Sequence, residues 1–341
     1  MDDIRTRRLH WRLPRESDFS AFLGLVSDHE VVKWTATWPH PPDRELVRRR
    51  CEPVPPEQGF AGLIWRDGAC IGAMGIVEAE LGFMFARRHW GRGYATEMAA
   101  AMIARAFQRH DWPQIEASVF AGNAASIRVL EKLGFAETGQ GTHANAAQGA
   151  SLPITHFALS RARWLAATPL RIETARLVIR PYRPADAPAF RAIANHAGVA
   201  RMMASLPHPM SEAQAADWIA ARAWTGRPGF CLGVFLRDGT LVGNLGLGGT
   251  PLSTMYFFGP RHWRRGYATE AMRALLGWAF AAFGLTEITA GAMADNPASR
   301  RVLEKLGFQR TGTATCKSPA RLEEVPEYLY RLSRTQFEAA P

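Results

Sequence analysis

The chain has 341 residues, of which 47% are hydrophobic and 21% charged, a balance that excludes a disordered or collagen-like protein. At roughly 150 residues per domain, this length indicates about two domains. The formal net charge is +10, carried by 37 arginines and only four lysines, and this excess favours an anionic partner without saying which kind.

The two halves of the chain repeat one another. RHWGRGYATE, from Arg88, and RHWRRGYATE, from Arg261, share nine of ten residues, and NAASIRVLEKLGF and NPASRRVLEKLGF share eleven of thirteen. Both pairs lie 173 residues apart, whereas the segments before them match at 168. We therefore predict two domains of one fold, residues 1–165 and 166–341, packed as a pseudo-twofold pair that mimics a homodimer.

Both repeats predict the same opening elements. Alternating apolar residues at 9–13 and 177–181 predict a strand, and Asp18 or Asp186 then stands where a helix N-cap is expected. In the second repeat Ser211 precedes a further helical pattern and is expected to cap it.

The middle and end of each repeat predict a sheet with helices. Three strands are expected, at 59–65, 70–77 and 81–85 and again at 230–236, 241–247 and 255–258, with Arg-Asp-Gly turning between the first two. An arginine-rich loop, a long helix, a strand, a short helix ending at Leu-Gly and two closing strands follow. The predicted fold class is α/β (α+β), each domain being a mixed, mostly antiparallel sheet flanked by helices.

The arginine-rich loop has the features of a phosphate site. Gly91 and Gly93 allow close backbone approach, and the helix that follows presents free N–H groups and a positive dipole end. The loop lacks the Lys-Ser/Thr of a P-loop, and Thr96 stands where a dinucleotide fingerprint needs its third glycine. Taken alone, the pattern also fits a tight turn that merely caps the helix.

The loop and the second repeated motif together resemble the GNAT superfamily of N-acetyltransferases. R-x-x-G-x-G at Arg88 is similar to that family's pyrophosphate loop, and WGRGYATE with N-x-x-S-x-x-x-L-E-K-x-G-F resembles the branch that contains ribosomal-protein alanine N-acetyltransferases. The opening at 174–180 agrees. The resemblance covers essentially the whole chain, twice, and implies acetyl-CoA as the acetyl donor.

The resemblance also implies which residues hold acetyl-CoA. Loop amides grip the pyrophosphate, the strand before the loop pairs with the pantetheine arm and polarises the thioester carbonyl, and the Asn of the short helix contacts the pantetheine. The implied positions are Phe83, Phe85, Arg88, Gly91, Arg92, Gly93, Tyr94, Ala95 and Asn123, and in the second repeat Phe258, Arg261, Arg264, Arg265, Gly266, Tyr267, Ala268 and Asn296.

The second repeat departs from the pattern at Arg264, which replaces the first glycine of the loop. Its backbone amide is expected to bind phosphate from ordinary dihedral angles, unless its side chain blocks the site. Trp90 and Trp263 are expected to anchor the loops in the core.

Acetyl transfer to an amine needs a neutral amine, a polarised carbonyl and a proton for the departing thiolate. Deprotonating an α-amine at pH 7 costs about 1 kcal/mol, whereas a lysine costs about 4–5 kcal/mol. A site with a weak base therefore serves α-amines more easily.

The proton donor is expected in the short helix. Many GNAT enzymes place a Tyr there, but the matching residues are Leu130 and Leu303. The resemblance makes the serine of the N-x-x-S motif, Ser126 or Ser299, the alternative donor. A hydroxyl bonded to the helix backbone is the structural alternative.

Glu80 is the candidate base of the first repeat, where it begins the strand that leads into the loop; the alternative is an ordinary charge at a strand edge. Ser253 takes its place in the second repeat, so the first repeat is expected to be the better catalyst. His40 and His208 lie in Pro-flanked loops that line the acceptor site by family analogy, and are substrate candidates against the alternative of exposed loop residues.

The leading hypothesis is an N-acetyltransferase that moves an acetyl group from acetyl-CoA to a primary amine, on a protein N-terminus or a small molecule, by direct attack on the thioester. The alternative is a non-catalytic acyl-CoA-binding or interaction protein, because both repeats lack the Tyr. No RNP, KH or helix-turn-helix pattern supports a nucleic-acid partner.

The cysteines and the apolar runs bear on location. None of the four cysteines lies in a CxxC or Cys/His cluster, so no metal site is expected. The N-terminus lacks an apolar signal core, and no apolar run approaches 18 residues, so neither export nor a membrane partner is expected. A reducing, cytoplasmic setting fits best.

Overall fold

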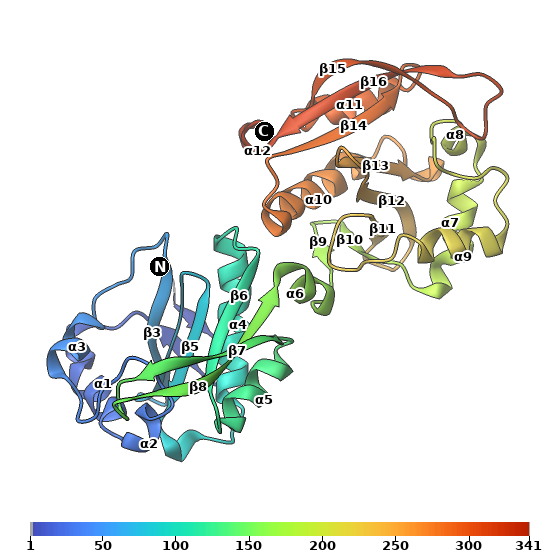
Figure 1. Cartoon of the computed structure of the whole chain (residues 1–341). Coiled ribbons are helices and arrows are strands. Elements are labelled where there is room, and N and C mark those ends of the chain that lie inside the picture. The colour runs from blue at the N-terminus through green and yellow to red at the C-terminus, as the bar shows by residue number, and fades with distance from the viewer. Residues whose placement is uncertain (1–2, 341) are drawn as a thin grey trace. The chain divides into compact units, whose positions relative to one another are not determined.

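A computed structural model of the chain describes residues 3–340, which divide into two compact units with the boundary between Trp164 and Leu165 (Figure 1). The boundary falls inside helix α6 (Arg161–Ala167), so the chain is helical where it passes from one unit to the next. None of the helices described has the length and apolar character that a membrane span requires.

The first unit holds an eight-stranded sheet of order β1-β2-β3-β4-β5-β6-β8-β7. Its strands are β1 (Ile4–Arg5), β2 (His10–Arg12), β3 (Gly59–Arg66), β4 (Ala69–Val77), β5 (Glu80–Phe85), β6 (Gln114–Phe120), β7 (Ala136–Asn145) and β8 (Ala150–Ser160). Its helices are α1 (Phe19–Val26), α2 (His29–Val32), α3 (Arg44–Arg49), α4 (Tyr94–Arg109) and α5 (Ala124–Lys132), with 3-10 turns at Glu16–Asp18 and Arg87–His89.

The second unit holds a sheet of order β15-β16-β14-β13-β12-β11-β10-β9. Its strands are β9 (Ile172–Glu173), β10 (Leu177–Pro181), β11 (Phe230–Leu236), β12 (Leu241–Gly248), β13 (Ser253–Phe258), β14 (Glu287–Met293), β15 (Gln309–Cys316) and β16 (Val325–Ser333). Its helices are α7 (Ala187–Ala194), α8 (Ala197–Ala200), α9 (Glu212–Ala220), α10 (Tyr267–Phe283), α11 (Pro297–Lys305) and α12 (Arg334–Ala339), with 3-10 turns at Pro184–Asp186 and Pro260–His262.

Among the described strands, only β5 with β6 and β13 with β14 run parallel. The predicted fold class, with mixed, mostly antiparallel sheets flanked by helices, is confirmed. The cap expected at Ser211 is also present: its hydroxyl accepts the N–H of Gln214, whose side chain accepts the N–H of Ser211.

Each sheet separates two apolar cores. In the second unit, Ala290 and Ala292 of β14 face the core beneath α10 and α11, together with Phe258 of β13. Phe257, the neighbour of Phe258, faces the other core, which α7 and α9 cover. Because successive side chains of a strand point to opposite faces, the two faces of this sheet have different helical neighbours.

The two parallel strands of each sheet separate soon after they begin. β13 pairs with β14 only at Ser253–Thr289 and Thr254–Ala290, and β5 pairs with β6 only at Glu80–Glu116. Backbone groups of β13 that are directed toward β14 from residue 255 onward therefore have no strand partner. This opening interrupts the middle of the sheet and connects its two faces.

Asp18 and Asp186 stand at the predicted N-cap positions of α1 and α7, but their carboxylates bind elsewhere. Neither carboxylate caps the helix that follows it. Asp18 instead binds Arg12 (Oδ2 to Nη1, 2.6 Å) and the N–H of Arg15 (2.7 Å). Arg12 lies six residues before Asp18 and binds its carboxylate. In the second unit, Arg180 binds the carboxylate of Asp186 in the same way.

We expect Asp18→Asn to lower the free energy of unfolding of the first unit by about 2 kcal/mol at pH 7, since the buried Asp18 is paired with Arg12. The hydrogen bond from Arg12 lowers the pKa of Asp18. This stabilisation is therefore present above the unfolded pKa, about 3.9, and disappears as pH falls through the lower folded value. Urea unfolding followed by tryptophan fluorescence measures it.

The matched control is Glu16→Gln, which removes an exposed neighbouring carboxylate and should leave stability unchanged. If wild type and Asp18→Asn lose the same free energy between pH 5 and pH 3, the ion pair does not contribute as described.

Candidate active site

In each unit the arginine-rich loop ends in a left-handed glycine at which the long helix starts. Gly93 (φ 75°) is the N-cap residue of α4, and Gly266 (φ 78°) is that of α10. The first N–H groups of an α-helix have no acceptor within the helix, and with the helix dipole they favour an anion. This backbone has the form that a diphosphate requires.

The expectation that Arg264 keeps ordinary dihedral angles is wrong. Its φ is 59°, close to the 72° of Gly91 at the same place in the first loop. The left-handed region costs an L-residue about 1–2 kcal/mol, so the loop imposes its shape on this arginine. The Arg264 side chain lines the cavity described below, where it adds a positive charge.

Trp90 and Trp263 are not core anchors, contrary to expectation. Their exposed fractions are 44% and 47%. Each indole N–H donates to the carbonyl at the end of the preceding strand, Phe85 or Phe258, at 2.6 Å. The indole group thus closes the turn by a hydrogen bond, and its ring remains open to solvent.

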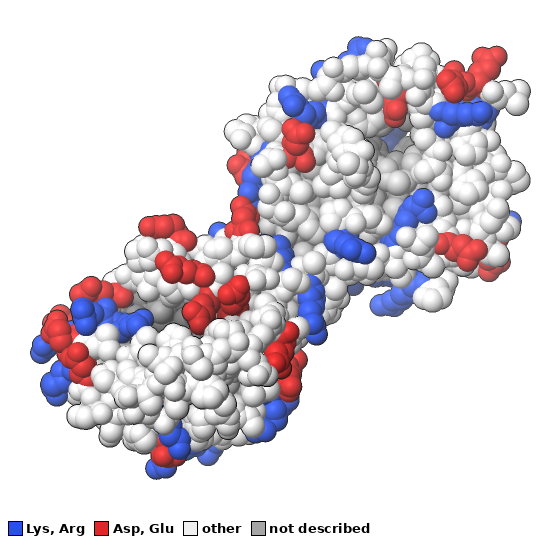
Figure 2. All heavy atoms as spheres, in the orientation of Figure 1, with Lys and Arg blue, Asp and Glu red and all other residues white. Residues whose placement is uncertain are grey.

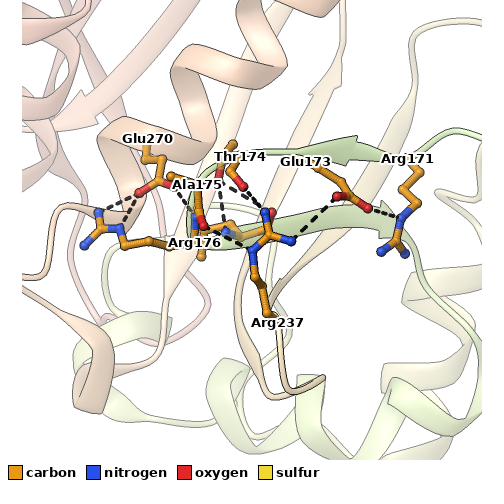
Figure 3. A network of polar contacts seen from close by, with 8 residues as sticks. Arg171, Glu173, Thr174, Ala175, Arg176, Arg237 and Glu270 are labelled. Atoms are coloured by element: carbon orange, nitrogen blue, oxygen red, sulfur yellow. Dashed lines mark hydrogen bonds and ion pairs between the residues drawn. The ribbon is translucent and has the colours of Figure 1, made fainter.

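Glu270, in the first turn of α10, ties the loop to the start of the second unit (Figure 3). It accepts hydrogen bonds from the hydroxyl of Thr174 (2.5 Å) and from the N–H and Nε of Arg176 (3.1 and 2.7 Å). Nη1 of Arg176 in turn donates to the carbonyl of Arg265 in the loop (2.9 Å). We call Thr174, Arg176 and Glu270 the loop brace.

A second arginine holds the outer side of this brace. Arg237, in the turn after β11, donates to the carbonyls of Thr174 (2.6 Å) and Ala175 (3.1 Å). Glu173 pairs with Arg237 and with Arg171 (Figure 3). The segment that carries the brace is therefore fixed from both sides.

The first unit repeats the brace. Thr6 and Arg8 bind Glu97 at 2.6 Å each, and Nη1 of Arg8 donates to the carbonyl of Arg92 (3.1 Å). Burial raises the pKa of Glu97, but the hydrogen bonds from Thr6 and Arg8 outweigh burial and the pKa is lowered overall. The same balance lowers the pKa of Glu270. Both carboxylates are therefore ionised at neutral pH.

The cavity of the first unit has a volume of about 480 Å³ and lies where β5 and β6 separate. Of the predicted residues, Glu80, Phe83, Asn123 and Ser126 line it. The predicted residues that do not line it are Phe85, Arg88, Gly91, Arg92, Gly93, Tyr94 and Ala95. The loop and the opening of the sheet are thus not joined by one cavity in this unit.

The cavity of the second unit has a volume of about 810 Å³ and includes both the opening of the sheet and the loop. Figure 2 shows a hollow in the surface of this unit. The predicted residues that line this cavity are Phe258, Arg264, Gly266, Tyr267, Ala268, Asn296 and Ser299, whereas Arg261 and Arg265 do not.

Asn123 and Asn296 cap their own helices. The side-chain oxygen of Asn123 accepts the N–H of Ser126 (3.2 Å), and that of Asn296 accepts the N–H of Ser299 (3.0 Å). This leaves each amide NH₂ group on the cavity wall as a hydrogen-bond donor.

The two candidate serines differ in their partners. Oγ of Ser299 lies 2.8 Å from the hydroxyl of Tyr256, which also donates to the carbonyl of Ser299 (3.1 Å). Tyr256 is on β13 and lines the cavity, and burial raises its pKa, so the phenol is protonated at neutral pH. Phe83 is the matching residue of the first unit, and it lines the same cavity as Ser126.

Tyr256 is not among the residues predicted for the site. Its signal is a difference between the repeats, Tyr256 against Phe83, within strands that otherwise match in position. A hydroxyl that is present in only one of two repeated strands indicates that the two cavities differ in their hydrogen-bonding groups.

The remaining candidates lie apart from the cavities. His40 is exposed and its ring contacts that of His29, with centroids 5.0 Å apart. His208 is half-buried and lines neither cavity. Residues 3–340 contain no group of three His, Cys, Asp or Glu side chains that could hold a metal ion.

Comparison with known proteins identifies the family of both units. The family described as acetyltransferase (GNAT) domain matches residues 8–136 and 176–309. YkkB of Bacillus subtilis, an uncharacterised protein, is 41% identical over 91 residues, which cover 23% of this chain and 53% of that protein. The uncharacterised N-acetyltransferase YoaA of Bacillus subtilis is 33% identical over 149 residues, covering 41% of this chain and 84% of YoaA.

Among solved structures, the chain is similar to a GNAT-family acetyltransferase from Bacillus anthracis. The two share 25% identity with a TM-score of 0.43, over 48% of this chain and 98% of that one.

We expect Glu270→Gln to weaken binding of coenzyme A to the second unit about tenfold, equivalent to about 1.4 kcal/mol, because Arg176 then loses the ion pair that aims it at the loop. Calorimetric titration of the full chain measures this. Glu173→Gln is the matched control, since it alters the outer part of the same network but not the loop. Equal affinity of Glu270→Gln and wild type would show that the brace does not shape the site.

Proposed function

The chain belongs to the acetyltransferase (GNAT) family, and we propose that it transfers the acetyl group of acetyl-CoA to a primary amine. As an N-acetyltransferase it must bind the acetyl donor, hold the thioester carbonyl and supply a proton to the departing thiolate. One observation carries the proposal: in the second unit a single cavity joins the loop, the opening of the sheet and Ser299.

The residues of this cavity fit coenzyme A by their chemistry. The N-terminus of α10 presents unpaired N–H groups, and Arg264 adds positive charge, both suited to a diphosphate. The unpaired edge of β13 presents backbone donors and acceptors to an amide-containing arm such as pantetheine, and the amide of Asn296 adds a side-chain donor. Bound there, acetyl-CoA supplies the activated acetyl group.

Ser299 gives its proton to the thiolate in this proposal, and Tyr256 replaces it. The 2.8 Å contact between the two hydroxyls lets a proton pass from one to the other. Tyr256 therefore fills the chemical role that Leu303 cannot fill from the helix. This argument favours catalysis over the alternative of a protein that only binds acyl-CoA.

The amine is proposed to be an α-amine of a protein N-terminus, with small-molecule amines as the second class. An α-amine needs only about 1 kcal/mol for deprotonation at pH 7, against about 4–5 kcal/mol for lysine. The resemblance of both motifs to the ribosomal-protein branch supports the same class. A cytoplasmic setting belongs to the proposal too, and the free state of all four cysteines agrees with it.

The second unit is proposed as the more active one, which reverses the ranking expected from the sequence. That ranking depended on Glu80 and Gly91, which are replaced by Ser253 and Arg264 in the second repeat. The larger cavity that reaches the loop, and the Tyr256–Ser299 pair, favour the second unit.

We expect Gly266→Glu to weaken binding of acetyl-CoA to the second unit about 100-fold, because a carboxylate would face the phosphates, and to remove most turnover. Gly266→Ala measures the strain of the left-handed position alone, and Gly93→Glu tests the first unit. Release of free thiol is followed with a panel of amines that includes a peptide with N-terminal alanine. The proposed ranking is contradicted if Gly93→Glu removes turnover and Gly266→Glu does not; tight binding without thiol release for any amine supports the non-catalytic alternative.

We expect Tyr256→Phe to lower kcat about 100-fold while the Kd of acetyl-CoA stays unchanged, since Phe is the residue that the first unit carries at this place. The control is Tyr328→Phe, on β16 of the same sheet and outside the cavity lining. A change in Kd with unchanged kcat would assign Tyr256 to packing rather than to proton supply.

A further inference from the structure

Glu327, on β16, is a carboxylate that the mechanism above does not use. It lines the cavity of the second unit and is paired across the sheet with Met293 of β14. Its Oε1 lies directly over Gly291, so close that a Cβ at residue 291 would overlap it. The glycine therefore makes room for this carboxylate.

Glu327 and the Tyr256–Ser299 pair lie on opposite faces of the sheet. Ala290 and Ala292 face the core beneath α10 and α11, so strand alternation puts Gly291 and Met293 on the other face, and Glu327 shares the face of its partner Met293. Tyr256 packs on the α10–α11 side. The opening between β13 and β14 connects the two faces.

The Glu327 carboxylate has no hydrogen-bond or ion-pair partner among residues 3–340, although it is half-buried. Its partner across the sheet, Met293, is apolar and lines the same cavity, as do Met255 and Cys316. Burial raises the pKa of Glu327. Desolvation costs a carboxylate free energy, and a cation bound beside it offsets that cost.

The first unit has a different arrangement at the same register. Ile154 pairs with Phe120 as Glu327 pairs with Met293, and Ser118, which takes the place of Gly291, binds His156 (3.1 Å). An apolar side chain therefore stands where the second unit has its carboxylate. The two cavities cannot bind the same acceptor in the same way.

We propose that Glu327 binds the ammonium group of the acceptor and takes its proton, which makes the substrate of the second unit a cationic primary amine. This proposal rests on the proposed acetyl transfer. It places the acceptor on the face of the sheet opposite the proton donor, so that amine and thioester meet in the opening between β13 and β14.

The step balances with these groups. The ammonium gives one proton to the Glu327 carboxylate, the amine lone pair forms the N–C bond at the thioester carbon, and the C–S bond breaks with its electrons on sulfur. Ser299 gives a proton to that sulfur and Tyr256 restores Ser299. The amide nitrogen loses its second proton to solvent, which also takes the proton of Glu327 and reprotonates Tyr256. The net products are an amide, a free thiol and one proton.

Binding of benzylamine and of its neutral isostere benzyl alcohol tests the site without turnover. Both are titrated into the full chain with coenzyme A present, in wild type, Glu327→Gln and the control Glu324→Gln, an exposed carboxylate outside the cavity lining. We expect Glu327→Gln to weaken benzylamine at least tenfold and leave benzyl alcohol unchanged. Equal binding of benzylamine to wild type and Glu327→Gln overturns the proposal, as does a parallel loss of both probes.

Measurements of turnover distinguish the proposed role of Glu327 from the proposed acetyl transfer on which it rests. In a chain that carries Gly93→Glu to silence the first unit, we expect Glu327→Gln to lower kcat/KM for the amine about 100-fold with an unchanged Kd for acetyl-CoA. Unchanged kcat/KM in Glu327→Gln contradicts the role of Glu327 alone. Failure of the unaltered chain to bind acetyl-CoA contradicts acetyl transfer itself.

Discussion

The separation of two parallel strands is the constraint on which the candidate site depends. β13 and β14 pair at only two positions and then diverge, so the eight-stranded sheet is open between them. A closed sheet would leave no path between its faces and no unpaired backbone edge. Because antiparallel partners hold both strands on their outer sides, the opening persists without unfolding the sheet.

The loop brace holds the arginine-rich loop and the N-terminus of α10 in place relative to this opening. Backbone amides recognise phosphate only when the loop keeps its shape, and left-handed residues are costly to hold in place. The brace meets this need with a carboxylate in the first turn of the helix and an arginine from the start of the unit. The two are some ninety residues apart in sequence, so the brace is a tertiary contact that forms only when both ends of this segment come together.

The repeated motifs predicted the order of strands and helices well, because turns, caps and periodic apolar residues are local signals. Side-chain partners were predicted less well. Asp18 stands at the N-cap as predicted, but its carboxylate binds the arginine on the strand before it. Trp90 was predicted to be a core residue because indole is apolar, whereas its N–H closes the turn and its ring is exposed. Tyr256 and Glu327 come from separate strands, and only the folded sheet brings them to one cavity.

The opening through the second sheet has a consequence for ligand design. A molecule that joins an ammonium group to a thiol-linked diphosphate would pass through the opening between β13 and β14 and contact residues on both faces of the sheet at once. Linking the two halves in one compound removes the entropy of bringing in a second body, so its affinity should exceed that of either fragment by several orders of magnitude. Since Ile154 occupies the corresponding place in the other sheet, such a bisubstrate compound would discriminate between two otherwise similar halves of a single polypeptide.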